Sequence, residues 1–149
     1  MIGDTLTEAG CHAIVRGAAE VGDLAGIDAV IVAGGLYANR WHRDARRFVR
    51  RNAAALRVLP VWLVSSGPLD DSATQHDIPP TSQVTKLVAR VGARGHVTFG
   101  GRLAADAKGF PASVLAKKKA GDWRDPAHVR SWVASVVSEL RSAQIKRGD

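Results

Sequence analysis

The sequence predicts an α/β protein in which a parallel sheet is covered by helices on both faces. Apolar segments at residues 28–33, 60–65 and 96–100 have the composition of strands. The first two are almost continuously apolar and rich in β-branched residues, which is typical of strands buried on both faces of a parallel sheet. Amphipathic segments separate the three, so strands and helices alternate along the chain. With 149 residues, the chain is expected to form a single domain, residues 1–149, around one core.

The N-terminal part is expected to contain the end of a helix and two strands. Asp4–Ala9 predicts a helix that Gly10 stops, because glycine is favoured just past a helix C-terminus. Cys11–Arg16 has alternating character and predicts a short strand, followed by a loop rich in glycine and aspartate. Asp28–Ala33 is the clearest strand of the sequence, and we expect the two glycines after it to end it.

The middle of the chain predicts a helix and a second buried strand. A helix from about His42 to Leu56 has an inward face with three-four spacing, formed by Ala45, Phe48, Val49, Asn52, Ala53 and Leu56. Pro60–Ser65 then predicts a buried strand, and a polar loop covers residues 66–79.

The C-terminal part predicts two helices around a last strand, His96–Gly100. Thr81 or Ser82 is suited to cap the first helix, whose apolar stripe is Val84, Leu87, Val88 and Val91. An irregular stretch, residues 101–124, contains a short helix around Ala112–Lys119. The final helix has Asp125 as its cap and Pro126 in its first turn, and its apolar stripe is Val129, Trp132, Val133, Val136, Val137 and Leu140.

The chain is basic, with a formal net charge of +7, and much of this charge is local. Seven arginines lie between Arg40 and Arg57 against one acid, Asp44, and Lys117–Lys119 form a second basic group. Such segments attract nucleic acid, anionic lipid or acidic proteins without selecting one of them. Because no helix-turn-helix, RRM or KH signature is present, no specific nucleic-acid binding is expected.

Other signals exclude several classes of protein. The five histidines have no paired spacing and no partner cysteines, so no metal site is predicted and the histidines are expected on the surface or in loops. The single cysteine, Cys11, fits a reducing compartment. We expect it to be a small buried side chain and not a reactive thiol. The apolar runs are too short to span a bilayer, and the acidic N-terminus does not resemble a signal peptide. These features together predict a cytoplasmic protein.

Ligands of open parallel sheets bind at the carboxyl ends of the strands. Here those ends are followed by residues 34–42, 65–79 and 101–124. Gly34 and Gly35 would let a ligand approach the backbone, while Tyr37 and Trp41 offer aromatic faces, and the second loop adds hydroxyl groups and backbone amides from Ser65, Ser66 and Gly67. Two interpretations remain open: the loops hold a flat heteroaromatic ring, or Gly34-Gly35 forms a tight turn and the aromatic residues cap the core.

Residues 27–71 resemble the flavodoxin-domain family that includes the menaquinone-dependent protoporphyrinogen oxidases. In this family, a buried strand is followed by a loop that contains a glycine, a tyrosine and a histidine in this order. The next helix contains a Phe-Val pair in its first half. The matching residues are Gly34 or Gly35, Tyr37, His42, Phe48 and Val49. The strand ending in Ser65-Ser66 and the Asp122-Trp123 pair before the last helix also look like features of this family. The order of these features is more specific than any one of them.

The resemblance implies a flavodoxin-like fold that binds FMN noncovalently and moves electrons through it. Gly35, Leu36, Tyr37 and Ala38 would line one side of the flavin ring, and Ser65, Ser66 and Gly67 the other. The other cofactor-binding residues that the resemblance implies are Gly34, Trp41 and His42. Because the cofactor carries the electrons, no catalytic side chain is predicted. The resemblance implies an FMN-dependent oxidoreductase that exchanges electrons with a redox partner protein or a quinone. Residues 101–124 would match a loop that such oxidases use near the substrate or the membrane. A peripheral membrane contact is therefore also implied.

The sequence departs from the family at its front end. Flavodoxins begin with a central strand and a Ser/Thr-rich loop that cradles the FMN phosphate at a helix N-terminus, whereas this sequence starts inside the helix that follows that loop. Three explanations are open: the true start lies upstream, Cys11–Arg16 pairs directly beside Asp28–Ala33, or a second copy fills the gap in a homodimer. The alternative function is a flavodoxin-like binding module without flavin that uses Arg40–Arg57 to bind an acidic partner or nucleic acid.

Overall fold

The computed structural model describes residues 1–103 and 120–148. The chain divides into two compact units. The terminal unit contains Met1–Gly17 and Asp125–Asp149, and the sheet unit contains Ala18–Arg124. The short helix expected around Ala112–Lys119 and the basic group Lys117–Lys119 lie outside the described residues.

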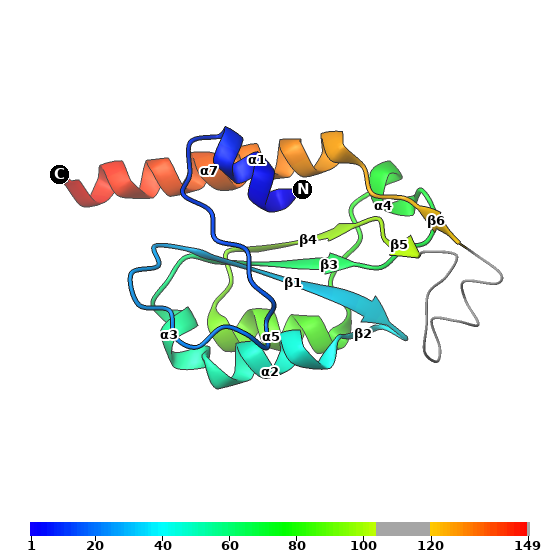
Figure 1. The fold of residues 1–149 in the computed structure, drawn as a ribbon, viewed down its shortest axis with the longest axis horizontal. Coiled ribbons are helices and arrows are strands. Elements are labelled where there is room, and N and C mark those ends of the chain that lie inside the picture. The colour runs from blue at the N-terminus through cyan, green and yellow to red at the C-terminus, as the bar shows by residue number, and fades with distance from the viewer. Residues whose placement is uncertain (104–119, 149) are drawn as a thin grey trace. The chain divides into compact units, whose positions relative to one another are not determined.

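The sheet unit is built on a four-stranded sheet with the order β2-β1-β3-β4 (Figure 1). Its strands are β1 (Val30–Tyr37), β2 (Arg40–Trp41), β3 (Val61–Ser66) and β4 (Gly95–Phe99). Strands β1, β3 and β4 are parallel, and only the short β2 runs antiparallel, beside the end of β1. The prediction of an α/β fold with a mostly parallel, flavodoxin-like sheet is therefore confirmed.

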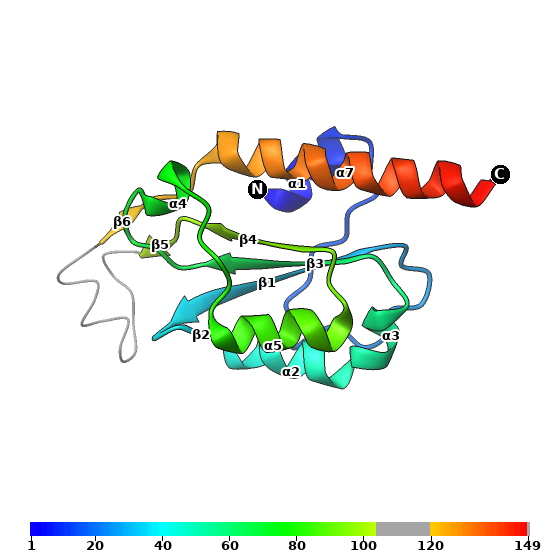
Figure 2. The same cartoon turned by 180° about the vertical axis from the view of Figure 1, so that it is seen from behind.

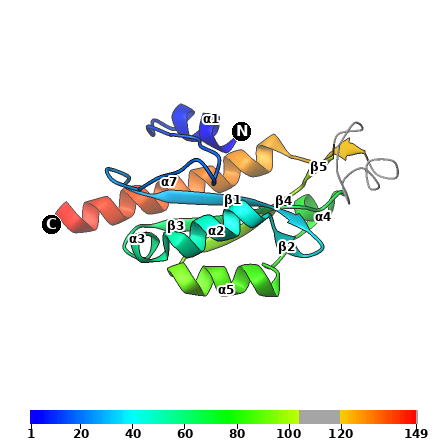
Figure 3. The same ribbon diagram turned by 60° about the horizontal axis from the view of Figure 1, so that its bottom comes forward.

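Helices α2 (Arg43–Arg51), α3 (Ala53–Arg57) and α5 (Ser82–Val91) lie along one face of this sheet, with α2 and α5 side by side (Figure 3). Their inward residues follow the spacing expected from the sequence. The core between these helices and the strands consists of Val32, Trp41, Ala45, Phe48, Val49, Leu56, Val61, Leu63, Val84, Leu87 and Val91. The hydroxyl group of Thr81 accepts a hydrogen bond from the backbone N–H of Val84, which confirms Thr81 as the cap of α5.

Strand β3 has the burial expected of it, and β1 does not. All residues from Val61 to Ser65 are buried. In β1, Val32 and Gly34 are buried but Ala33 is exposed, so the prediction that this strand is buried on both faces is wrong. The prediction that Gly34 and Gly35 end the strand is also wrong, because both glycines pair with β3 and the strand continues to Tyr37. A glycine ends a strand only where the backbone turns. Here the backbone of both glycines stays extended because it is hydrogen-bonded to the neighbouring strand.

The segment Cys11–Arg16 forms no strand, so that prediction is wrong. Alternating character shows only that a segment could form a strand, and formation requires a neighbouring strand to supply the hydrogen-bond ladder. Ile14 and Val15 of this segment are 58% and 78% exposed. Helix α1 (Ile2–Glu8), by contrast, ends as expected: Gly10 has φ +85, and the N–H groups of Gly10 and Cys11 donate to the carbonyls of Thr7 and Leu6.

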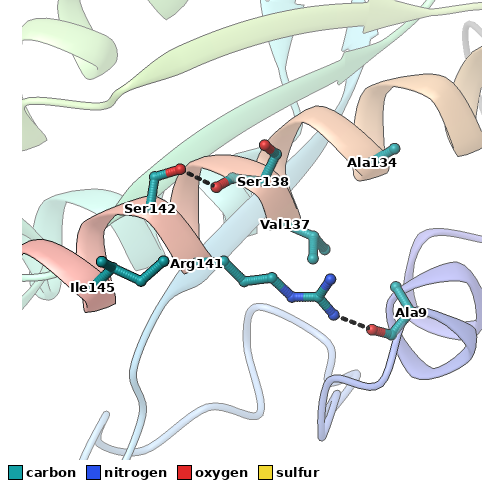
Figure 4. A pocket seen from close by; sticks show the side chains of 7 residues that line it. All are labelled: Ala9, Ala134, Val137, Ser138, Arg141, Ser142 and Ile145. Atoms are coloured by element: carbon teal, nitrogen blue, oxygen red, sulfur yellow. Dashed lines mark hydrogen bonds between the residues drawn. The ribbon is translucent and has the colours of Figure 1, made fainter.

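The terminal unit combines α1 with α7 (Pro126–Gly148). The Asp125 carboxylate accepts from the backbone N–H of Ala127 at 2.8 Å, which confirms it as the helix cap. The Arg141 guanidinium donates to the Ala9 carbonyl at 2.9 Å beside a shallow cavity of about 350 Å³ (Figure 4). The buried residues of α7 are Val129, Val133, Val136 and Val137. No described helix combines the length and the apolar character needed to cross a membrane.

Candidate functional site

The carboxyl ends of β1, β3 and β4 meet at one edge of the sheet, where α4 (Ser72–Gln75), β5 (Arg102–Leu103) and β6 (Gly121–Asp122) also gather (Figure 2). Gly35 pairs with Ser66, and Ser66 pairs with Phe99. The N–H of Gly67 donates to the carbonyl of Phe99, and the N–H of Gly101 donates to the carbonyl of Pro68 at 2.8 Å. The three loops that the sequence predicted as a ligand edge are therefore neighbours at their described ends.

The β1–β2 hairpin and the loop after β3 touch each other at this edge. A Cβ atom added to Gly67 would lie 2.8 Å from the Leu36 Cβ, so the Leu36 side chain lies directly against the Gly67 backbone. Ser66 is half-buried, and its hydroxyl group donates to the carbonyl of Gly100 at 3.4 Å. Leu36, Ser66 and Gly67 thus form a continuous surface from the two loops.

The tip of the hairpin holds Tyr37, Ala38 and Asn39, all exposed. Ala38 and Asn39 have φ angles of +48 and +61, the left-handed pair that a two-residue type I′ hairpin requires. Tyr37 is 45% exposed and pairs with Arg40. Its ring is the exposed aromatic surface that the expected site residues offer at this edge.

Replacing Ala38 by glycine should raise the free energy of unfolding by about 0.5–1 kcal/mol, because the left-handed conformation strains a Cβ and not a glycine. Urea unfolding followed by circular dichroism measures this change. Ala54→Gly, in the exposed part of α3, is the matched control and should lower stability by about 1 kcal/mol. Destabilisation by both substitutions would mean that Ala38 is unstrained in solution.

Trp41 is 1% exposed and lies below the hairpin in the core. Its backbone N–H donates to Gln83 Oε1 at 2.9 Å, and its carbonyl accepts from Arg46 Nε at 3.0 Å. Its indole Nε1–H donates to Ser65 Oγ at 2.9 Å. The ring covers Gly34, where an added Cβ would lie 2.4 Å from Trp41 Cδ2. The structure therefore uses Gly34 and Trp41 to anchor the hairpin.

Ser65 is 1% exposed, and its Oγ lies 2.8 Å from His96 Nε2. Burial lowers the pKa of His96 below its ordinary value of 6.5, so the ring is neutral near pH 7. When the ring proton is on Nδ1, the neutral Nε2 accepts a hydrogen bond from the Ser65 hydroxyl, while Ser65 Oγ accepts from the indole of Trp41. A serine nucleophile must be reachable by its substrate, so this buried Ser–His pair is a structural contact. The expectation of surface or loop histidines is wrong for His96, a half-buried residue of β4.

His42 caps α2, where its Nδ1 accepts from the backbone N–H of Asp44 at 3.3 Å. Of the expected site residues, Leu36, Tyr37, Ala38, Ser66 and Gly67 lie at the edge, and Gly35 continues into it. Gly34, Trp41 and Ser65 lie beneath it and support it.

Sequence reasoning did not assign a role to Gly100, Gly101 or Gln83. The N–H of Trp123 donates to the carbonyl of Gly101 at 2.9 Å, and a Cβ atom on Gly100 would lie 2.0 Å from the Trp123 carbonyl oxygen. Close by, the Arg124 guanidinium donates to both carboxylate oxygens of Asp122, which holds the pKa of that carboxyl well below its usual range. The adjacent glycines were the available signal, because paired glycines mark close backbone approach.

The edge offers surfaces for a flat ring, while its helix starts are poorly suited to an anion. Leu36 and Gly67 supply a surface, and Tyr37 supplies an aromatic face. A phosphate needs free N–H groups at a helix start, and at the starts of α2, α4 and α5 a side-chain cap or acidic residues compete with an anion. Asp70 and Asp71 precede α4, and the caps of α2 and α5 already accept from backbone N–H groups. Within residues 1–103 and 120–148, no cluster of His, Cys, Asp or Glu could hold a metal ion.

Residues 1–110 match the family described as the flavodoxin domain. No curated protein and no solved structure matches the chain.

Proposed function

Because the chain belongs to the flavodoxin-domain family, we propose that it binds flavin mononucleotide at the carboxyl edge of the sheet and takes part in electron transfer. The observation that supports this function is the contact between the hairpin residue Leu36 and the loop residue Gly67, next to the exposed ring of Tyr37. In flavodoxin-like folds, ligands bind at this edge.

The residues of this chain bind and orient the ring. Bound flavin supplies the electron-carrying chemistry, so the protein needs no nucleophile or acid pair. Tyr37 packs on one part of the ring, and Leu36 with the Ser66–Gly67 backbone packs on another. The buried contacts of Trp41 with Ser65, Gln83 and Arg46 fix the hairpin that carries Tyr37, which reduces the entropy lost on binding. We include in this proposal that the flavin exchanges electrons with a redox protein or a quinone. The proposal also includes a peripheral contact of the protein with a membrane.

Replacing Tyr37 by alanine should weaken flavin binding about tenfold, the effect of losing an aromatic stacking partner. Titration of riboflavin and FMN with protein, followed by quenching of flavin fluorescence, measures both affinities. Because no described helix start of the sheet unit suits a phosphate, FMN and riboflavin should bind within about threefold of each other.

Tyr37→Phe is the matched control and should retain most of the affinity. Thr74→Ala, on the exposed surface of α4, controls for unspecific effects of substitution. Absence of binding of either flavin at high micromolar concentration would refute the flavin function. A much higher affinity for FMN than for riboflavin would show that a phosphate site exists and would contradict the ring-only mode of binding.

One observation favours a second candidate function, a binding module for an acidic partner protein. Helices α2, α3 and α5 of one layer carry Asp44 as their single acid, against the exposed basic residues Arg43, Arg47, Arg50, Arg51, Arg57, Lys86 and Arg90. Strongly salt-dependent binding to an acidic protein, without any binding of flavin, would favour this function. Equal binding to generic duplex DNA would show that the layer recognises polyanions in general.

A further inference from the structure

On one side of β1, backbone groups have no partner among residues 1–103 and 120–148. The N–H of Val30 donates to the carbonyl of Pro60, which precedes β3. Every second residue of β1, starting with Val30, therefore directs its backbone N–H and carbonyl toward β3, and the residues between them direct theirs toward the opposite edge. On that edge the Gly35 carbonyl accepts from the N–H of His42 at 2.9 Å. The N–H and carbonyl groups of Ile31 and Ala33 also face this edge, and the described residues provide no partner for them.

Within the described residues, this edge lacks the charged side chains and prolines with which proteins protect exposed strands. Residues Val30–Gly35 contain no charge and no proline, and Ala33 is exposed. Unprotected apolar edges pair with other strands. In the flavodoxin-like strand order 2-1-3-4-5, a further strand lies on this side, and within the described residues only the two-residue β2 occupies part of it.

We propose that a second copy of this chain pairs antiparallel along this edge, with the two-fold axis beside Val32. In this register Ile31 of each copy faces Ala33 of the other, and the free N–H and carbonyl groups of both residues form about four hydrogen bonds between the copies. The ladder between the copies ends at Val30 of each copy, because Gly35 and Leu36 beyond it are already paired with His42 and Trp41. The contact is closed and isologous, so it ends at the dimer.

Charge complementarity supports this occupant over other strands. Asp28 lies just before β1, and Arg40 lies on β2, at the far end of the same edge; both are exposed. Antiparallel pairing brings Asp28 of each copy next to Arg40 of the other, which makes two equivalent ion pairs. Neither side chain has an ion pair or a hydrogen bond elsewhere in residues 1–103 and 120–148.

Analytical ultracentrifugation of the purified full chain, from about 1 to 100 μM, tests the proposal, since small interfaces associate weakly. Wild type should reach a dimer within this range. Ala33→Pro should stay monomeric with its fold intact by circular dichroism, because proline is tolerated where the N–H of an edge strand points outward. Ala33→Ser keeps the N–H and should still dimerise. A monomeric wild type, or a dimer unaffected by Ala33→Pro, would overturn the proposal.

A charge swap tests the register without altering the strand. Asp28→Arg and Arg40→Asp should each raise the dimer dissociation constant about tenfold, because each breaks both ion pairs and adds repulsion. The double variant Asp28→Arg/Arg40→Asp should restore association. Arg47→Asp, an equal charge change on α2, should have no such effect. Failure of the double variant to recover would overturn this register. Because the readout is mass, it is independent of flavin binding.

Discussion

Replacing Trp41 by alanine is expected to lower the free energy of unfolding by about 3–5 kcal/mol, the range for deleting a buried aromatic side chain. The side chain is 1% exposed and packs on Gly34, so its removal leaves a cavity between β1 and the helices. It also leaves the Ser65 hydroxyl without the indole N–H that it accepts. Urea unfolding at one fixed protein concentration measures the loss.

Two further variants separate packing from hydrogen bonding at this position. Trp41→Phe keeps most of the ring volume and removes the indole donor, so it should cost about 1–2 kcal/mol. In a double-mutant cycle with Ser65→Ala, the two losses should be less than additive, because both remove the same bond. A loss below about 1 kcal/mol for Trp41→Ala would contradict the role of this ring in holding the hairpin.

The fold class was predictable because the residues of β3 alone indicate a strand that is buried on both faces. An unbroken apolar run such as Val61–Val64 can only be stable when both faces are covered. The exposure of Ala33 could not be predicted in the same way, because it depends on whether another strand or helix covers β1. The same reason explains Cys11–Arg16: the residues favour a strand, but none of the strands in the described part of the chain pairs with it.

The candidate site shows a similar limit. Sequence reasoning predicted that these loops lie together, since parallel strands end at one edge of a sheet, and their described ends do. It could not determine that Ser65 would bond to Trp41 and His96, residues 24 and 31 positions away in the chain. A serine and an aromatic residue after a strand are equally suited to a ligand and to the core. The choice depends on side-chain partners that come together only in the folded chain.

Glycine at position 100 is expected to be as indispensable as the Trp41 ring. Gly100→Ala should lower the free energy of unfolding by about 3 kcal/mol, at the upper end of the cost of overpacking. The added Cβ would lie 2.0 Å from the Trp123 carbonyl oxygen and 2.7 Å from its carbon, and backbone cannot turn away as a flexible side chain can. Trp123 is held in place by its hydrogen bond to Gly101 and by its ring over Gly121.

The matched control is Gly22→Ala, because an added Cβ at Gly22 meets no atom within 4 Å and its φ is not left-handed. This variant should be neutral or slightly stabilising, since alanine reduces the entropy of the unfolded chain. Thermal unfolding of both variants beside wild type gives the comparison. If Gly100→Ala unfolded at the same temperature as Gly22→Ala, the chain of Trp123 would not cross Gly100 closely, and the base of the β5–β6 pair would be free to move away from the edge.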